Sequence, residues 1–529
     1  MKYIEGTSRD QLCLFPVSIN SAISQDNEVR VIDLFIESLS LKDFGFRVDF
    51  GENGRPAYHP KDLLKLYIYG YMNKVRSSRD FEKECRRNLE VMWLLKQLQP
   101  DHNTISNFRR DNSESIRKVF NETVRIAKYF DLIGKKLLAG DSTKLRAQNS
   151  KKNNYNKKKI DRHLEYIENK LNQYNQILAK EDCDKPEEIK QEINKQLNRK
   201  EKYKDLEKKL QESQQEQIST SDSESRQMIT RNNITEVAYN AQVSTDAKHC
   251  IPVDYKVTNS NDSKAMSEMV NRAAEIYETT DFTALYDKGY HTGSEIKKVQ
   301  DMGVNLLVAV PDVSSNAPDK SYNVCNFSYD KEQDTYRCPQ GEELHTNGKW
   351  YNKNRGDNRE IIRIKQYKTK ACKTCAVREK CTTSTTNSRV IERSEFAEHI
   401  EKNRQNVEEN QHLYKRRQAI VEHPFGTIKR QWGFNYIITK QGIQRASSDV
   451  GFMLTAYNLR RIITILGIEV FKHYLQGICL LFSTVSDLFK LKISHFKTTH
   501  FIIKVFSIHF DYSPYDFKFR QNLRLNGGF

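Results

Sequence analysis

The chain is a basic protein of 529 residues, with 86 lysines and arginines against 69 aspartates and glutamates and a net charge of +17. This length exceeds what one simple core accommodates, so several domains or insertions are expected. The charge favours a polyanion as partner, nucleic acid first, although a solvated lysine-rich surface has the same composition. The sequence has no signal-peptide pattern and no run approaching the roughly 18 apolar residues of a membrane span, which predicts a soluble, cytoplasmic protein without a membrane partner.

Residues 1–130 are expected to form an N-terminal helical domain, because apolar residues recur at helical spacing in three stretches, 29–39, 60–70 and 79–98. Asp101 or Asn103 can cap a further helix, which would carry Arg109 and Arg110 outward. A small bundle with exposed arginines suits DNA binding, and its helix-turn-helix pattern is weak. The alternative is an ordinary helical packing domain.

Residues 150–218 change sharply to Lys, Glu, Asn and Gln and are expected to form an inserted, coiled-coil-like helical hairpin. Six apolar residues alternate spacings of four and three and so share one seam: Ile160, Leu164, Ile167, Leu171, Tyr174 and Leu178. A break at 182–186 precedes a second helix of looser periodicity. The hairpin suits self-association or DNA tracking, and a solvated spacer without a specific role fits the pattern equally well.

The segment 131–466 is predicted to be an α/β domain with a mixed sheet flanked by helices. Residues 236–244 and 251–258 have the alternation of paired strands, and helical and apolar patterns alternate after them. Asp141 and Asp287 each follow an apolar run, so we expect each to close a strand and the two carboxylates to lie side by side. A lone aspartate at a strand end is more often a cap or turn residue.

Two adjacent carboxylates repel one another unless a cation is supplied, and Mg²⁺ or Mn²⁺ prefers such oxygen ligands. Glu422, far along the chain in a basic stretch, would supply a third acid. Three carboxylates can hold two ions about 3.5 to 4 Å apart, one activating the attacking hydroxyl and the other stabilising the leaving oxygen. Asp141, Asp287 and Glu422 are therefore candidate catalytic, metal-binding residues for phosphodiester cleavage.

The segment around Glu422 combines one acid with groups that bind phosphate, namely Tyr414, Arg417, Lys429 and Arg430. In one continuous helix Lys429 would share the face of Glu422, and Arg417 would point about 140° away. Pro424 predicts a kink or break at this point. An amphipathic helix with a surface ion pair is the alternative. Trp432, close by, is a candidate for stacking on an exposed DNA base or for core packing.

A Cys-rich insertion with small β-structure is predicted at 312–398. It holds four cysteines that are candidate metal ligands: Cys338, Cys372, Cys375 and Cys381. A CxxC turn delivers two thiolates from one knuckle and distant cysteines complete a tetrahedral set, so a structural Zn²⁺ site is expected. Reduced, unligated thiols and a redox role are the alternatives. The tail at 467–529 has no pattern that assigns it a role.

Three motifs in this order resemble those of bacterial insertion-sequence DDE transposases of the eleven-eighty-two group: Gly140-Asp141-Ser-Thr-Lys, Tyr286-Asp287-Lys-Gly-Tyr and the stretch 414–430. Residues 54–60 and 101–109 likewise resemble the InsH-type N-terminal domain of that group, and its members also have a cysteine-rich insert before the catalytic glutamate.

The resemblance implies a ribonuclease H-like catalytic core with Asp141, Asp287 and Glu422 as the metal-binding triad. It also implies that Tyr414, Arg417 and Lys429 belong to a signature whose basic residues hold a phosphate. Arg417 lies one residue farther from Glu422 than is usual in that signature.

The function implied is a transposase that binds the terminal inverted repeats of its element, cleaves DNA and joins the freed 3′ hydroxyl to target DNA. Its place would be the bacterial cytoplasm, associated with the nucleoid. A homodimer is the simplest assembly that synapses two ends. The alternatives are a Mg²⁺-dependent ribonuclease H-like nuclease without strand transfer and a non-catalytic, zinc-stabilised DNA-binding protein.

Overall fold

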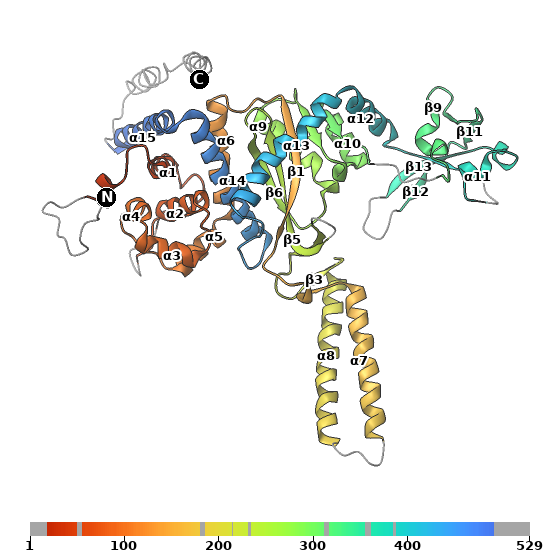
Figure 1. Cartoon of the computed structure of the whole chain (residues 1–529), viewed down its shortest axis with the longest axis horizontal. Helices are drawn as coiled ribbons and strands as arrows, with labels where there is room; N and C mark the ends of the chain where they lie inside the picture. The colour runs from red at the N-terminus through yellow and green to blue at the C-terminus, as the bar shows by residue number, and fades with distance from the viewer. Residues whose placement is uncertain are drawn as a thin grey trace, which may run out of the picture. The chain divides into compact units, whose positions relative to one another are not determined.

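The computed structural model describes residues 18–49, 56–179, 186–213, 215–230, 234–311, 317–354, 361–384 and 388–490, without the side chains of 482–490. The protein is of mixed α/β class and has two compact units (Figure 1). The first comprises Met1–Gly134, Ser142–Ser260 and Glu422–Phe529, and the second comprises Lys135–Asp141 and Asn261–Val421. Parts of the sequence predictions, at 54–55, 182–185, 312–316, 385–387 and beyond 490, lie outside the described residues.

Helices open the first unit: α1 (Glu28–Glu37), α2 (Pro60–Met72), α3 (Ser78–Arg87), α4 (Leu89–Leu94), α5 (His102–Asp111) and α6 (Ser113–Tyr129). The stretch 79–98, predicted as one helix, is divided at Asn88. Its backbone is extended and its side chain accepts hydrogen bonds from the N–H groups of Glu90 and Val91, at 3.0 and 3.3 Å, so a new helix begins there. Asp101 caps α5 as expected.

The two helices predicted within 150–218 are present as α7 (Lys157–Leu178) and α8 (Pro186–Glu212), which lie side by side (Figure 1). Their shared core contains Ile160, Leu206 and Leu210. At the base of the hairpin, where the chain enters α7 and leaves α8, β2 (Asn154–Tyr155) pairs antiparallel with β3 (Ile218–Ser219) and so joins the two ends.

The first unit also contains β4 (Arg226–Ile229), β5 (Thr235–Asp246) and β6 (Ile251–Thr258). Strands β5 and β6 pair antiparallel, and they correspond to the paired strands predicted at 236–244 and 251–258. Strand β4 also pairs antiparallel with β5. In the same sheet β5 is a neighbour of β1 (Leu137–Arg146). The unit ends with α14 (Ile443–Leu466) and α15 (Ile468–Lys490). The middle section of α14 is buried on nearly every side.

In the second unit the first residues of β1 pair parallel with β7 (Thr283–Tyr286), which pairs parallel with β8 (Asn305–Val308). The accompanying helices are α9 (Met266–Tyr277), α10 (Gly293–Asp301), α12 (Ala397–Glu409) and most of α13 (Gln411–Phe425). Asn403 of α12 fastens this helix to the sheet, because its amide exchanges two 2.9 Å hydrogen bonds with the backbone of Val308.

A separate antiparallel sheet lies within the range 312–398. It consists of β9 (Ser328–Asp330), β10 (Thr335–Arg337), β11 (Glu343–Thr346), β12 (Tyr351–Lys353), β13 (Ile362–Lys368) and β14 (Ile391–Ser394), with the short helix α11 (Arg378–Cys381) between the last two. The order is β12-β13-β11-β10-β9, with β14 pairing on β13. Tyr336, Leu344, Tyr367 and Ile391 form its small core.

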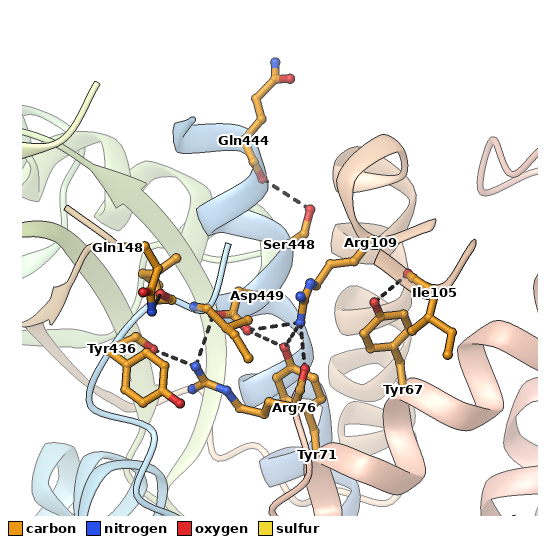
Figure 2. Close-up of polar contacts among 12 residues, drawn as sticks. Tyr67, Tyr71, Arg76, Ile105, Arg109, Gln148, Tyr436, Gln444, Ser448 and Asp449 are labelled. Carbon is orange, nitrogen blue, oxygen red and sulfur yellow. Dashed lines mark hydrogen bonds and ion pairs between the residues drawn. The ribbon is translucent and has the colours of Figure 1, made fainter. Parts of the chain in front are cut away.

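A fully buried carboxylate, Asp449 of α14, joins the helices of the first unit (Figure 2). It accepts hydrogen bonds from the Tyr71 hydroxyl and, at 2.8 Å, from the backbone N–H of Ile438. The guanidinium groups of Arg76 and Arg109 lie 3.6 and 4.0 Å from its oxygens. Burial raises the pKa of Tyr71 well above its usual value, and the negative charge of Asp449 raises it further. The phenol therefore stays protonated and remains a hydrogen-bond donor.

Within the described part of the chain, no helix alone is long and apolar enough to cross a membrane. Helix α14 and residues Ile468–Leu481 of α15 are together long and apolar enough to do so by length and composition alone, but the pair is bent by 113°.

Replacing Asp449 by Asn should lower the free energy of unfolding by about 3 to 5 kcal/mol, because two buried arginines lose the carboxylate that lies beside them. Urea denaturation of the full chain measures this change. Asp80→Asn is the matched control, since Asp80 is an exposed residue whose ion pair with Lys83 spans 3.5 Å, and it should cost less than about 1 kcal/mol. Equal costs at the two positions would contradict the central place given to Asp449.

Candidate functional site

The parallel pairing of β1 with β7 aligns two of the predicted acids. Leu137 lies opposite Thr283 and Ala139 opposite Leu285, so the partners' numbers differ by 146, as do those of Asp141 and Asp287. Neighbouring strands lie about 5 Å apart, and Asp141 and Asp287 therefore follow the last paired residues at the same level. The prediction that the two acids are brought together is thus supported by the register.

The two acids end their strands differently. Asp287 follows the last residue of β7, as predicted. Asp141 does not close β1, contrary to expectation, because this strand continues to Arg146. The pairing with β7 stops at Ala139, and from Ser142 onward the strand belongs to the first unit, where β5 is its neighbour. The sequence shows only where the apolar run before Asp141 ends. Strand β1 continues beyond this point because β5 is available there as a second pairing partner.

Glycine at position 140 lets the aromatic ring of Tyr286 lie against the backbone of β1. A Cβ atom built on Gly140 would be 2.1 Å from Cε1 and 2.2 Å from Cζ of that ring. Tyr286 is buried and meets the buried Tyr290 edge to face, with ring centroids 4.8 Å apart. Gly140 and Tyr286, which directly precede the two acids, therefore pack against one another.

Asp287 is held by its own turn. Its Oδ1 accepts a 2.9 Å hydrogen bond from the N–H of Gly289, within the 3-10 turn Lys288–Tyr290 that it caps. This contact uses one carboxylate oxygen in a local turn and orients the side chain just beyond β7.

Helix α13 contributes an arginine, Arg417, and a tyrosine, Tyr414, that contact the same two strands. Nη1 of Arg417 lies 3.2 Å from Oδ2 of Asp141, and the side chains are 16% and 22% exposed, so the pair is largely shielded from water. The Tyr414 hydroxyl donates a 3.2 Å hydrogen bond to the carbonyl of Tyr286. The structure therefore places Asp141, Asp287, Tyr414 and Arg417 in one cluster.

The electrostatics of this cluster show that its members influence one another. Burial opposes the charge of Arg417, but Asp141 and then Tyr414 and Asp287 outweigh it and raise the pKa of the guanidinium. Burial raises the pKa of Tyr414, while Arg417 lowers it and both aspartates raise it further. A protonated phenol and a guanidinium thus face two carboxylates.

Glu422 lies in α13, as predicted, and its side chain is exposed. The segment Glu422–Phe529, which begins at this residue, belongs to the first unit. Pro424 does not break the helix. The hydrogen-bonding pattern instead changes after Phe425 to a π-helix, Gly426–Gln431. A π-helical turn is rare and is found frequently at functional sites. Angles estimated from ideal α-helical geometry therefore do not hold for Lys429.

Within the first unit, Nζ of Lys429 donates a 2.8 Å hydrogen bond to Oγ1 of Thr143. Thr143 and Asp141 are two residues apart on β1 and share one face of the strand. Thr143 was not among the residues predicted for the site, although its i, i+2 spacing from Asp141 was a signal for it. Arg430, by contrast, is exposed, and its predicted role in DNA binding stays a prediction.

Two predicted DNA contacts are wrong in their expected form. Arg109 does not point outward: it is 5% exposed and donates hydrogen bonds to the Tyr71 hydroxyl at 3.0 Å and the Arg76 carbonyl at 3.2 Å (Figure 2). Trp432 is 7% exposed and packs against Phe434, with ring centroids 5.7 Å apart, so the alternative of core packing is confirmed in place of stacking on a base. Arg110 is exposed and paired with Asp111.

The four candidate zinc ligands line one cavity in the second unit: Cys338, Cys372, Cys375 and Cys381. Burial raises the pKa of the Cys372 and Cys381 thiols, and the other cysteines of the set raise it further. Soft thiolate donors in this number suit Zn²⁺. In the part of the chain that the structure describes, however, no three or more His, Cys, Asp or Glu side chains are arranged as a ready metal site, at the cysteines or at the carboxylates.

Two family models match the chain. Residues 17–111 match a transposase domain (DUF772), and residues 337–463 match a transposase DDE domain. The second match contains Arg417, Glu422 and Lys429 and begins after both aspartates. No curated protein matches the chain.

Replacing Gly140 by Ala should destabilise the protein by about 1 to 3 kcal/mol, because the methyl group overlaps the Tyr286 ring and forces one of the strands to move. Urea unfolding measures the loss. Gly477→Ala in α15 is the control, since a Cβ there meets no atom within 4 Å. Two equally stable variants would show that the ring does not need the space over Gly140.

Proposed function

We propose that this chain, which is similar to a transposase domain at residues 17–111 and to a transposase DDE domain at 337–463, is an insertion-sequence DDE transposase that cleaves DNA at the ends of its element and joins the 3′ hydroxyl to target DNA. The observation that carries the proposal is the register of β1 and β7, which aligns Asp141 with Asp287 beside Arg417. Carboxylates at one level on adjacent strands are suited to sharing divalent cations.

The residues that would hold the ions are Asp141, Asp287 and Glu422, whose hard oxygen donors fit Mg²⁺ or Mn²⁺. Such ions, when bound, activate the attacking oxygen and stabilise the leaving one. Glu422 enters this set by its place on α13, five residues after Arg417, and by the family's acidic motifs. In this proposal the sheet is ribonuclease H-like, which agrees with a parallel β1, β7 and β8 and an antiparallel β5 and β6.

Arg417 has two roles in the proposed mechanism. Without ions its guanidinium neutralises Asp141 across 3.2 Å, which lowers the repulsion between the neighbouring carboxylates. A phosphate group offers the same guanidinium a bidentate partner. We propose that Arg417 exchanges Asp141 for the scissile phosphate, and thereby frees a carboxylate oxygen for a metal ion. Tyr414 and Lys429 would hold flanking phosphates.

The same function assigns roles to the N-terminal helices and to the small cysteine-rich sheet. The helices matched at residues 17–111 would bind the terminal repeats, and two chains would synapse the two ends. We further propose that Cys338, Cys372, Cys375 and Cys381 bind a structural Zn²⁺ that stabilises the small sheet β9–β14, because the four thiols converge on one cavity beside its core.

Asp287→Asn should reduce Mg²⁺-dependent strand transfer by on the order of a thousandfold, about 4 kcal/mol of barrier, since the amide cannot carry the charge that binds the ion. The assay uses a labelled duplex of the element's terminal repeat and a plasmid target. Asp281→Asn is the control: Asp281 is exposed, precedes β7 at its other end and pairs with Lys136 at 2.7 Å, so activity should persist.

The products of the unmodified chain separate the alternatives. Joined products that disappear with Asp287→Asn support the transposase. Cleavage without joining would favour the nuclease, and binding without cleavage would contradict both enzymatic proposals.

Elemental analysis of the purified protein should find one zinc per chain, and the pair of changes Cys372→Ser and Cys375→Ser should remove it and lower the melting temperature. Cys325→Ser is the control, because Cys325 is exposed and does not line the cavity. A folded, zinc-free chain would contradict the zinc proposal and leave the carboxylate site unaffected.

A further inference from the structure

The outward side of α8 has an unusual composition over three helical turns. A shallow groove there is lined only by amide and basic side chains: Gln191, Asn194, Lys195, Asn198, Arg199 and Lys202. These positions follow the i, i+3, i+4, i+7 spacing that places residues on one helix face. No acidic or apolar residue lines the groove, although acids are frequent elsewhere in α8.

Packing against α7 determines which side of α8 is outward. Leu206 and Leu210 are buried against Ile160, and Lys200 pairs across the two helices with Glu168 at 3.0 Å. Gln196, on the same inner side, is 6% exposed and accepts a 3.1 Å hydrogen bond from Arg199, which lies at the edge of the groove. Near the end of the hairpin that β2 and β3 close, His163 stacks on Tyr203 with ring centroids 4.8 Å apart. The groove face therefore has a defined orientation within the hairpin.

The groove chemistry matches double-stranded DNA. Asn and Gln side chains can pair with adenine edges, whereas Lys and Arg can pair with guanine or with phosphates. Residues 191–202 span about 16 Å of helix, roughly the rise of five base pairs, and an α-helix fits the major groove. A protein partner for a helix of this kind needs an apolar stripe, and the groove has none.

We infer that the outward face of α8, Gln191 to Lys202, is a second DNA-binding surface that lies in the major groove, apart from the residues that hold the reacting phosphates. The basic side chains contact the backbone and Asn194 and Asn198 read bases. The inference rests on the proposed function for its partner, because DNA is the substrate of that function.

The test compares two variants of the full chain with the same loss of charge. The groove variant carries Lys195→Ala, Arg199→Ala and Lys202→Ala. The control carries Lys190→Ala, Lys204→Ala and Lys208→Ala, at positions of α8 outside the groove. Fluorescence anisotropy gives the Kd for a terminal-repeat duplex with its flanking DNA at several salt concentrations.

The groove variant should bind at least about tenfold more weakly, and the slope of log K against log salt should fall in magnitude by about 2 to 3, close to 0.9 for each phosphate that the variant leaves without a basic partner. The control should match the unmodified chain. Asn194→Ala with Asn198→Ala should instead reduce the preference for the terminal-repeat duplex over a scrambled one by about tenfold.

Equal affinity of the groove and control variants would overturn the inference. A change in mass by light scattering without a change in DNA affinity would overturn it in favour of contact between chains. Strand transfer by the control variant separates this result from failure of the proposed function, since this variant keeps the groove and should retain the activity of the unmodified chain. An unmodified chain that does not bind the duplex would overturn both.

Discussion

The hydrogen-bonded register of β1 and β7 is the constraint on which the candidate site depends. A shift of one residue would move Asp141 to the other face of the strand and separate it from Asp287 and Arg417. The register is supported from within, because Tyr286 occupies the space over Gly140 and Tyr414 bonds to the Tyr286 carbonyl. Gly140 and Tyr286, which directly precede the two acids in the sequence, thus help to fix the register that aligns Asp141 with Asp287.

Features that depend on neighbouring residues could be predicted from the sequence. The cap at Asp101, the seam of the helical hairpin and the strand that ends before Asp287 follow from local spacing, and the structure contains each of them. For these features the deciding contacts lie within a turn or two, or repeat with the period of the element. The four cysteines that share a cavity were identified instead by residue type and by the CxxC spacing.

Features decided by distant partners could not be predicted. Arg109 was expected at the surface, and it is buried because Tyr71 and Asp449, which are 378 residues apart, meet beside it. Lys429 lies in a π-helix and donates its hydrogen bond to Thr143, which is 286 residues away in the sequence. The fold is therefore needed to tell which basic residues of the chain are used in internal ion pairs and hydrogen bonds.

The central claim, that Asp141, Asp287 and Glu422 bind metal together, can be tested by replacing Mg²⁺ with Fe²⁺ in the DNA-bound protein. Ascorbate and peroxide then generate radicals at the ion, which cut the nearby backbone, and mass spectrometry identifies the fragments. If the three acids share the ions, cuts are expected next to all of them, and excess Mg²⁺ should suppress these cuts. Cuts beside Asp141 and Asp287 with none beside Glu422, or no localised cuts at all, would contradict it.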